Sequence, residues 1–174
     1  MNGREGSRRN TLIALGAVLF GWAGDARASQ CVTLFTISRS TNANVVHYDG
    51  CVDARGGLRA SDPVTAYWRM HAERGQREEL TWFERQFAYG FDLARSEGAS
   101  ELTLSLAALP ERPASIHVEA GRPRATLVIA GRRAVLHQIF VQLDQRSTFP
   151  SVLYVELRGA DARTGRSVRE RIEP

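Results

Sequence analysis

Apolar and polar residues alternate along most of this chain with a period of two, which is typical of β-strands. The alternation is clear in two neighbouring runs: residues 32–39, which carry Val, Thr, Ile and Phe, and residues 44–49. Between them lies Asn42, a residue that tolerates left-handed backbone and can hydrogen-bond to its own main chain. The pattern therefore predicts a β-hairpin near the start of the folded part.

A third alternating run covers residues 64–72 and follows Pro63. Because successive side chains of a strand point to opposite faces, we expect one face to belong to the core and the other to be solvated or to line a cleft. The two faces would carry Val64, Ala66, Trp68 and Met70 on one side and Thr65, Tyr67, Arg69 and His71 on the other.

One short helix is predicted after this run. Thr81 followed three residues later by Glu84 has the pattern of a capping box, and Gly90 is a natural stop. Leu80, Phe83 and Phe87 follow helical spacing. We expect a helix of two to three turns near residues 82–89, with its aromatic side chains packed as a lid over the core.

The remainder of the chain reads as strands separated by proline and glycine. The alternating runs are 102–106, 116–118, 127–129, 135–143 and 152–157, with a last turn at Thr164-Gly165 and a final strand at 167–172; the breakers are Pro110, Pro113, Gly121, Pro123, Gly131 and Pro150. His137 would lie on the apolar face of its strand. The predicted fold class is mainly β, an antiparallel barrel or sandwich of about eight strands with one short α-helix, and such a barrel can hold one small ligand.

The first 28 residues have the features of a cleaved signal peptide. Arg8 and Arg9 precede the apolar run 12–23, and Ala26-Arg27-Ala28 has the small-x-small order that signal peptidases cut after. The segment around the two arginines resembles a twin-arginine export signal. We therefore expect residues 1–28 to be removed, residues 29–174 to form a single β-rich domain, and the product to be periplasmic or secreted, without a membrane anchor.

The net charge of the chain is small once residues 1–28 are left out. All 23 basic residues are Arg, and the formal net charge is +4. Removing residues 1–28 takes away four Arg and two acids, which leaves +2. Nucleic-acid binding needs a strongly basic surface, so we expect no nucleic-acid partner.

Cys31 and Cys51 lie equidistant from Thr41. In a hairpin centred on that residue they would face each other at its open end, within the separation that a disulfide accepts. Export to an oxidising compartment favours the bond. The alternative is a pair of small buried thiols that never meet.

No motif indicates a catalytic machinery or a cofactor, and no catalytic residue is predicted. The chain has no Gly-rich phosphate loop, no G-x-S-x-G and no H-E-x-x-H. Aromatic residues with a few polar groups are typical of ligand pockets, and the candidates of this kind are Tyr48, Tyr67, Trp68, Arg69, Trp82 and Tyr89. Their alternative roles are ordinary ones, in the core or on a solvated strand face.

A metal site is the second candidate for chemistry. His47 and Asp49 lie two residues apart on one strand face, where His71 could join them, and imidazole and carboxylate are ligands for zinc or iron. No spacing here is diagnostic, and exposed strand faces carry such residues in any case. A metal is therefore considered but is not supported by a motif.

Several segments resemble the bacterial family called domain of unknown function 4833. They are Ile37-Ser38-Arg39-Ser40, Asn42-Ala43-Asn44-Val45-Val46, Tyr48-Asp49, Pro63-Val64, Tyr67-Trp68, Glu78-Glu79-Leu80-Thr81 and Phe87-Ala88-Tyr89-Gly90-Phe91. The resemblance spans most of residues 35–91 and fades after that. It implies an exported globular domain and brings no activity, cofactor or catalytic residue with it.

Three functions stay open at this point. The first is a non-enzymatic binding or accessory protein with a small-molecule site near residues 61–93. The second is a metal-assisted hydrolase that uses His47, Asp49 and His71. The third is a structural or protein-interaction domain in which the aromatic residues only fill the core and either the C-terminal tail or an open sheet edge meets a partner.

Overall fold

The computed structural model describes residues 30–95, 100–144, 146 and 151–174. The expected signal peptide, residues 1–28, lies outside the described residues. So does Pro150, one of the expected breakers.

The described chain contains strands, one α-helix and one 3-10 helix. In chain order they are β1 (Gln30–Arg39), β2 (Val45–Val52), β3 (Val64–Met70), η1 (His71–Glu73), β4 (Gln76–Glu79), α1 (Trp82–Phe87), β5 (Phe91–Arg95), β6 (Leu102–Leu106), β7 (Leu109–Glu119), β8 (Arg122–Ile129), β9 (Arg132–Asp144), β10 (Ser151–Asp161) and β11 (Ser167–Ile172).

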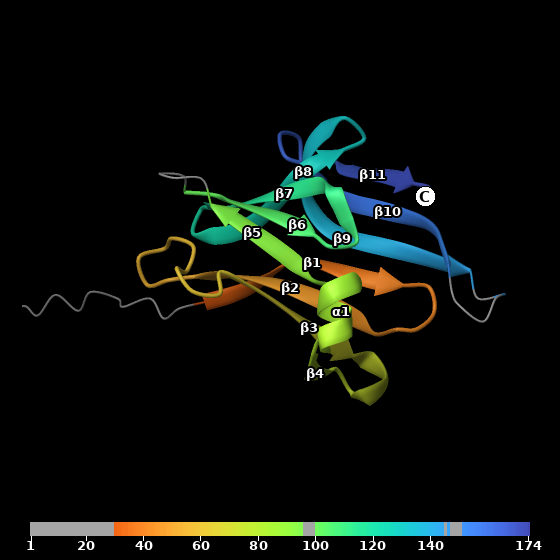
Figure 1. The fold of residues 1–174 in the computed structure, drawn as a ribbon. Coiled ribbons are helices and arrows are strands. Elements are labelled where there is room, and N and C mark those ends of the chain that lie inside the picture. Colours follow the sequence, from red (N-terminus) through yellow and green to blue (C-terminus); the bar gives the residue numbers. More distant parts are fainter. Residues whose placement is uncertain (1–29, 96–99, 145, 147–150) are drawn as a thin grey trace, which may run out of the picture.

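Nine of these strands form one sheet that curls into a half-barrel (Figure 1). Their order across the sheet is β4-β3-β2-β1-β9-β8-β7-β6-β5, and β10 and β11 are attached beside β9. All pairs are antiparallel except β1 with β9, which run parallel. The predicted fold class is confirmed, and the choice between barrel and sandwich that the sequence left open is resolved as a half-barrel.

Strand β9 joins the parts of the sheet because three strands pair with it. β10 pairs with β9 from Ala134 to Asp144 and therefore occupies one edge over nearly its whole length. β8 pairs with residues 132–135 and β1 pairs with residues 138–141, so these two strands share the other edge.

The core fills the inner face of the half-barrel. The rings of Phe35 and Tyr48 stack with their centroids 4.5 Å apart, and the Tyr48 hydroxyl donates a hydrogen bond to the Tyr89 carbonyl at 2.7 Å. Burial of this hydroxyl raises the pKa of Tyr48. The inward positions of the other strands are filled by fully buried aliphatic side chains, among them Leu104, Ile116, Ile129, Leu136 and Leu157.

The predicted hairpin and disulfide are both confirmed. β1 and β2 pair antiparallel with Cys31 opposite Cys51, and their sulfur atoms are bonded at 2.06 Å. In the turn, the Asn44 amide donates to the side-chain oxygen of Asn42 at 3.1 Å. Asn42 thus supplies the local hydrogen bond that its residue type predicts.

The predicted strand at 64–72 is too long and one strand was missed. β3 ends at Met70, and His71 begins the 3-10 helix η1. The two residues after this helix, Arg74 and Gly75, take positive φ values of 59° and 77°. The chain then returns as β4, whose sequence Gln-Arg-Glu-Glu shows no apolar alternation. An all-polar strand at a sheet edge gives no periodic signal, so alternation does not predict it.

The helix forms where predicted but is shorter and is not a lid. α1 has six residues and no buried residue, although the Thr81–Glu84 capping box is present. Trp82, Phe83 and Phe87 expose 73%, 65% and 60% of their surface. Within the described residues, no helix is long and apolar enough to cross a membrane.

Three prolines expected to separate strands lie inside them instead. Pro110 and Pro113 belong to β7, and Pro123 belongs to β8. Pro110 and Pro113 lie in the irregular stretch of β7 between its pairs at Leu109 and Ala114, before the β7–β8 ladder begins at Ser115. Pro123 pairs with β7 alone, because the β8–β9 ladder begins at Thr126. Proline is tolerated where its missing N–H would face an unpaired edge.

His137 does not lie in the core, in contrast to the expectation. Ala134 and Leu136 take the inward positions of this part of β9, and His137 is exposed on the outer face. The apolar alternation of β9 is interrupted between Leu136 and Ile139, where its register with β10 also shifts. A strict period of two therefore assigns His137 to the wrong face.

The disulfide should contribute measurably to stability because it closes a loop of 20 residues. Replacing Cys31 and Cys51 together by Ala should lower the free energy of unfolding by about 3 kcal/mol in the chain-entropy model. Urea denaturation followed by circular dichroism measures the change. Reductant should destabilise the parent chain and leave the double variant unchanged; equal stability of the two chains would contradict the prediction.

Candidate functional site

The inner face of the half-barrel contains a cavity of about 380 Å³ between the end of α1 and strands β9 and β10. Its walls come from five strands and from the segment that leaves the helix. The lining residues are Ile37, Arg39, Phe87, Ala88, Tyr89, Leu106, Ala108, Leu109, Ile139, Val141, Leu143, Val152 and Val155. The parallel pairing of β1 with β9 brings Ile37 beside Ile139 and thereby forms one wall.

Arg39 is the one charged residue among those that line this cavity. Its guanidinium carbon lies 4.9 Å from the ring centroid of Trp68 and 5.8 Å from that of Tyr89. The Nε atom of Arg39 is buried and has no hydrogen-bond partner in the part of the chain that the structure describes. The aromatic faces stabilise the charge, but one N–H donor is left without an acceptor.

A smaller polar hollow of about 200 Å³ lies on the other side of Arg39. Its lining includes Glu78, Thr81 and Glu84 as well as Trp68. Arg39 borders both hollows and so separates an apolar space from a polar one.

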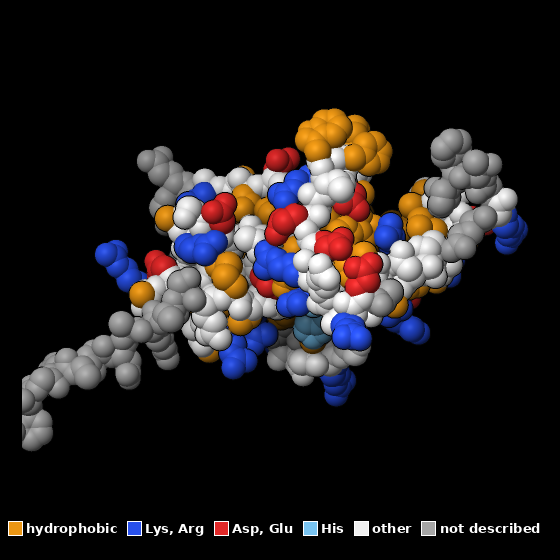
Figure 2. Space-filling model, turned by 90° about the horizontal axis from the view of Figure 1, so that it is seen from below, with side chains coloured by type: hydrophobic (Ala, Val, Ile, Leu, Met, Phe, Trp, Pro, Cys, Tyr) orange, Lys and Arg blue, Asp and Glu red, His pale blue; other side chains and the backbone are white. Residues whose placement is uncertain are grey.

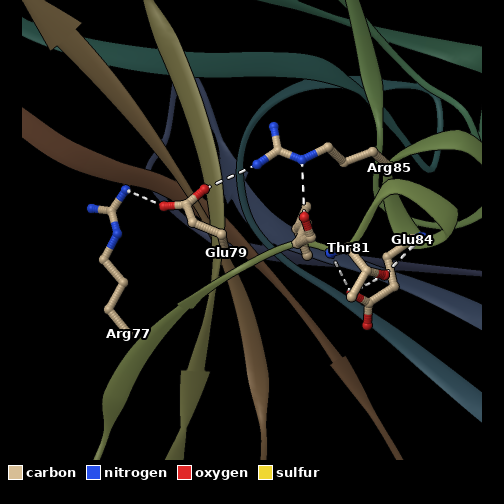
Figure 3. Close-up of polar contacts among 6 residues, drawn as sticks. Arg77, Glu79, Thr81, Glu84 and Arg85 are labelled. Carbon is tan, nitrogen blue, oxygen red and sulfur yellow. Dashed lines mark hydrogen bonds and ion pairs between the residues drawn. The ribbon is translucent and has the colours of Figure 1, made fainter.

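Glu84 fixes the position of Trp68 and therefore the surroundings of Arg39. One carboxylate oxygen accepts from the Trp68 indole N–H at 3.0 Å, and the other accepts from the Thr81 amide and hydroxyl, each at 2.8 Å (Figure 3 shows the Thr81–Glu84 pair). Burial by itself would raise the pKa of Glu84, but the hydrogen bonds from Thr81 and Trp68 and the charge of Arg39 outweigh it, and the pKa is lowered.

The aromatic side chains of α1 form an exposed cluster at the rim of the cavity. Phe87 lies 4.9 Å from Phe83 and 6.3 Å from Trp82 between ring centroids, and Phe87 also lines the cavity. The hydrophobic projection at the top of Figure 2 shows how far such side chains extend from the surface. The chain turns back at Gly90, where an added Cβ would lie 1.6 Å from the Arg85 carbonyl oxygen, so only glycine fits there.

The six predicted ligand residues lie in three separate places in the structure. Tyr48, Trp68 and Tyr89 lie together inside the half-barrel, with Trp68 and Tyr89 packed edge to face at 5.1 Å. Trp82 is exposed on α1. Tyr67 and Arg69 lie on the outer face, because their positions in β3 alternate with the inward Trp68.

The outer residues form a separate cluster around Tyr67. Arg77 lies 3.8 Å and Arg69 lies 5.4 Å from the Tyr67 ring centroid, and the Tyr67 hydroxyl donates to Asp49 at 2.8 Å. These neighbours leave only 3% of Tyr67 exposed although it points away from the core. Burial and the hydrogen bond to Asp49 both raise the pKa of Tyr67.

Two of the three metal candidates are neighbours in this outer cluster. The Thr33 hydroxyl donates to Asp49 at 2.8 Å and lies 3.3 Å from His47 Nδ1, and burial lowers the pKa of His47. His71 is exposed in η1. Among the described residues, no three His, Cys, Asp or Glu side chains form a group that could hold a metal ion.

Sequence reasoning did not single out Arg39, and it did not find the β9 and β10 wall of the cavity. A signal for Arg39 was present, since alternation from Phe35 through Ile37 places Arg39 on the inward face of its strand. A charged residue at an inward position is rare without a partner or a function. The β9 and β10 residues carry no such signal, because they are ordinary aliphatic side chains.

The fold and the cavity define the class of protein as a β half-barrel domain with an apolar cavity on its inner face. A family model described as a domain of unknown function (DUF4833) matches residues 35–171, and the chain belongs to this family. The resemblance found in the sequence is confirmed and extends well beyond residue 91. No curated protein and no solved structure matches the chain.

The contact between Glu84 and Trp68 predicts a pH-dependent signal. In the full chain with Trp22→Phe and Trp82→Phe, Trp68 is the single Trp. Its fluorescence should change with pH, and the midpoint should lie below pH 4.5, the ordinary pKa of Glu, because the pKa of Glu84 in the folded chain is lowered. The stabilisation that this contact contributes is fully present above the pKa that Glu84 has in the unfolded chain. It is lost as the pH falls through the lower pKa that Glu84 has in the folded chain. Glu84→Gln should abolish the transition and Glu78→Gln should keep it; a midpoint at or above 4.5 would show that the carboxylate is not stabilised.

Proposed function

We propose that this domain binds a small amphipathic molecule whose apolar part occupies the cavity inside the half-barrel and whose anionic group meets Arg39. The observation that carries the proposal is Arg39, the one charged residue among those that line the apolar cavity, whose buried Nε lacks an acceptor among the described residues. A carboxylate or similar anion would supply that acceptor.

The size and lining of the cavity support this class of ligand. Ligand sites occupy roughly 300–1,000 Å³ and combine mainly apolar walls with a few polar groups that fix orientation. The cavity of about 380 Å³ lies in that range, and Arg39 is the one charged group among its lining residues. An uncharged apolar molecule would leave the Arg39 donor unsatisfied, which is unfavourable for a buried polar group.

The neighbouring carboxylate does not take the place of a ligand. Both oxygens of Glu84 already accept hydrogen bonds from Thr81 or Trp68, so Glu84 acts on Arg39 through its charge. An incoming anion can therefore form a charge-assisted hydrogen bond without displacing an ion pair.

The hydrolase alternative has less support. It requires His47, Asp49 and His71 to act together, and the described residues contain no group of three such side chains that could hold a metal. Asp49 is also engaged by Thr33 and Tyr67, as expected for a residue with a structural role.

We also propose that the domain works outside the cytoplasm. The support is the order of Arg8 and Arg9, the apolar run and Ala26-Arg27-Ala28 in the sequence, together with the Cys31–Cys51 disulfide, because disulfides persist in oxidising compartments.

Binding can be tested with decanoate and 1-decanol, which share an apolar chain and differ in charge. Arg39→Met should weaken decanoate binding roughly tenfold to a hundredfold, the range for a hydrogen bond to a charged group, and should leave decanol binding nearly unchanged. Val141→Phe, which fills the cavity, should weaken both. Trp68 fluorescence and native mass spectrometry measure the affinities.

The matched control is Arg133→Met, an exposed arginine outside the cavity lining, which should alter neither affinity. If neither probe binds saturably, the proposal fails. If decanoate binds but Arg39→Met has no effect, the role of Arg39 is wrong.

Export can be tested by intact-mass analysis of the protein recovered from the periplasm. The chain should begin at Ser29, because cleavage is expected after Ala28. Changing Arg8 and Arg9 together to Lys should block export if the twin-arginine route is used, and export of that variant would indicate the general route. Recovery of the uncut chain in the cytoplasm would contradict the proposal.

A further inference from the structure

A second hollow, the seam groove, lies where the two ends of the curled sheet approach each other. It has a volume of about 520 Å³ and is lined by Asp62, Pro63, Val64, Thr65, Ala66, Arg77, Glu79, Arg85, Phe91 and Leu93. None of these residues lines the apolar cavity. The groove exists because β4 is short: it pairs with β3 only from Tyr67 to Met70 and leaves residues 64–66 uncovered.

Among the residues that the structure describes, the backbone of β3 presents groups without a partner to the seam groove. The Pro63 carbonyl accepts from the Cys51 amide of β2 at 2.8 Å, whereas the Met70 carbonyl accepts from Gly75 on the β4 side at 2.9 Å. Hydrogen-bonding directions alternate along a strand, so odd-numbered residues face β2 and even-numbered ones face the other way. The N–H and C=O groups of Val64 and Ala66 therefore point into the groove.

The same argument applies to β5 on the opposite side. The Gly90 carbonyl accepts from the Ala107 amide next to β6 at 2.9 Å, so even-numbered residues face β6. Phe91 and Leu93 then direct their N–H and C=O groups into the groove. Within the described residues, β5 pairs with β6 alone and no ladder joins it to β3.

The two edges run in the same direction, as the two neighbours of a single intervening antiparallel strand must. Every neighbouring pair along the sheet is antiparallel except β1 with β9. When the strand directions are followed from pair to pair, β3 and β5 are therefore found to run in the same direction. A single strand between them can therefore be antiparallel to each, in line with β4. Unpaired backbone groups at a sheet edge favour such an addition.

The floor and the rim of the groove specify the side chains of that strand. Val64 and Ala66 are buried, and Phe91 and Leu93 are half-buried, so the floor is apolar. The rim is charged: the Glu79 carboxylate contacts Arg77 at 3.4 Å and Arg85 at 2.9 Å (Figure 3). Asp62 lies at the Pro63 end of the groove. At the end near Glu79, two guanidinium groups share one carboxylate, so that end favours an acidic side chain.

We propose that the seam groove binds an extended peptide segment of a partner protein by strand addition. Apolar side chains of the segment alternate with polar ones, the apolar set faces the floor, and an acidic residue lies beside Arg77 and Arg85. The site is independent of the apolar cavity and of any ligand bound there.

Amide hydrogen exchange of the full chain, read by NMR, tests the proposal. In the free protein the amides of Val64, Ala66, Phe91 and Leu93 should exchange rapidly, and those of Thr65 and Asp92, which face β2 and β6, should be protected. The probe is a capped octapeptide that alternates Val with Thr and carries one Glu at a polar position. At about 100 times its Kd it should slow exchange of the four seam amides about 100-fold and leave Thr65 and Asp92 unchanged.

The matched control is the same peptide N-methylated at alternate residues, which removes the bonds to one edge and should lose the protection. Replacing its Glu by Lys should weaken binding by up to about fivefold, the range of an exposed ion pair. Three results would overturn the proposal: protection of the four amides in the free monomer, no protection by the octapeptide, or protection that rises with protein concentration alone, which would identify a second copy of this chain as the occupant.

Discussion

The sharing of one β9 edge by β8 and β1 is the constraint on which the other features of this fold depend. β10 fills the opposite edge, so β1 pairs with β9 beyond the point where β8 ends, and it runs parallel to β9 there. A close approach makes the junction possible: an added Cβ at Gly159 in β10 would lie 2.2 Å from the Val135 carbonyl oxygen of β9. Any larger residue at position 159 would push β10 away from β9 and loosen the wall that carries the cavity.

This junction places Arg39 at the end of β1, inside the half-barrel, where a charge needs compensation. The aromatic faces of Trp68 and Tyr89 provide part of it, because cations over desolvated rings gain about 2 kcal/mol. Glu84 provides another part by its charge and by holding the Trp68 indole. The capping box at the start of α1 thus has two roles, since the carboxylate that caps the helix also orients the ring on which Arg39 lies.

The features that the sequence predicted correctly are those that depend on residues close together along the chain. The β1–β2 hairpin, its disulfide, the capping box at Thr81 and the final strand at residues 167–172 follow from turn residues, spacing and alternation. β4 was missed because its charged residues have no apolar period. The cavity could not be predicted because it joins residue 37 to residue 155 through a parallel strand pair, and neither alternation nor spacing specifies which strands become neighbours.

The half-barrel leaves strand edges that a closed barrel would remove. At one end of the sheet, the all-polar β4 and the charged residues Arg77 and Glu79 restrict pairing, as charges on edge strands generally do. Residues 64–66 of β3 have no such protection on their own backbone, but they follow Pro63 and face a groove bordered by Arg85. A flat edge from another molecule would meet these side chains before it reached the backbone, whereas a single narrow strand could pass between them. The rim therefore opposes sheet-to-sheet aggregation, and for this reason the proposed partner is a single extended segment.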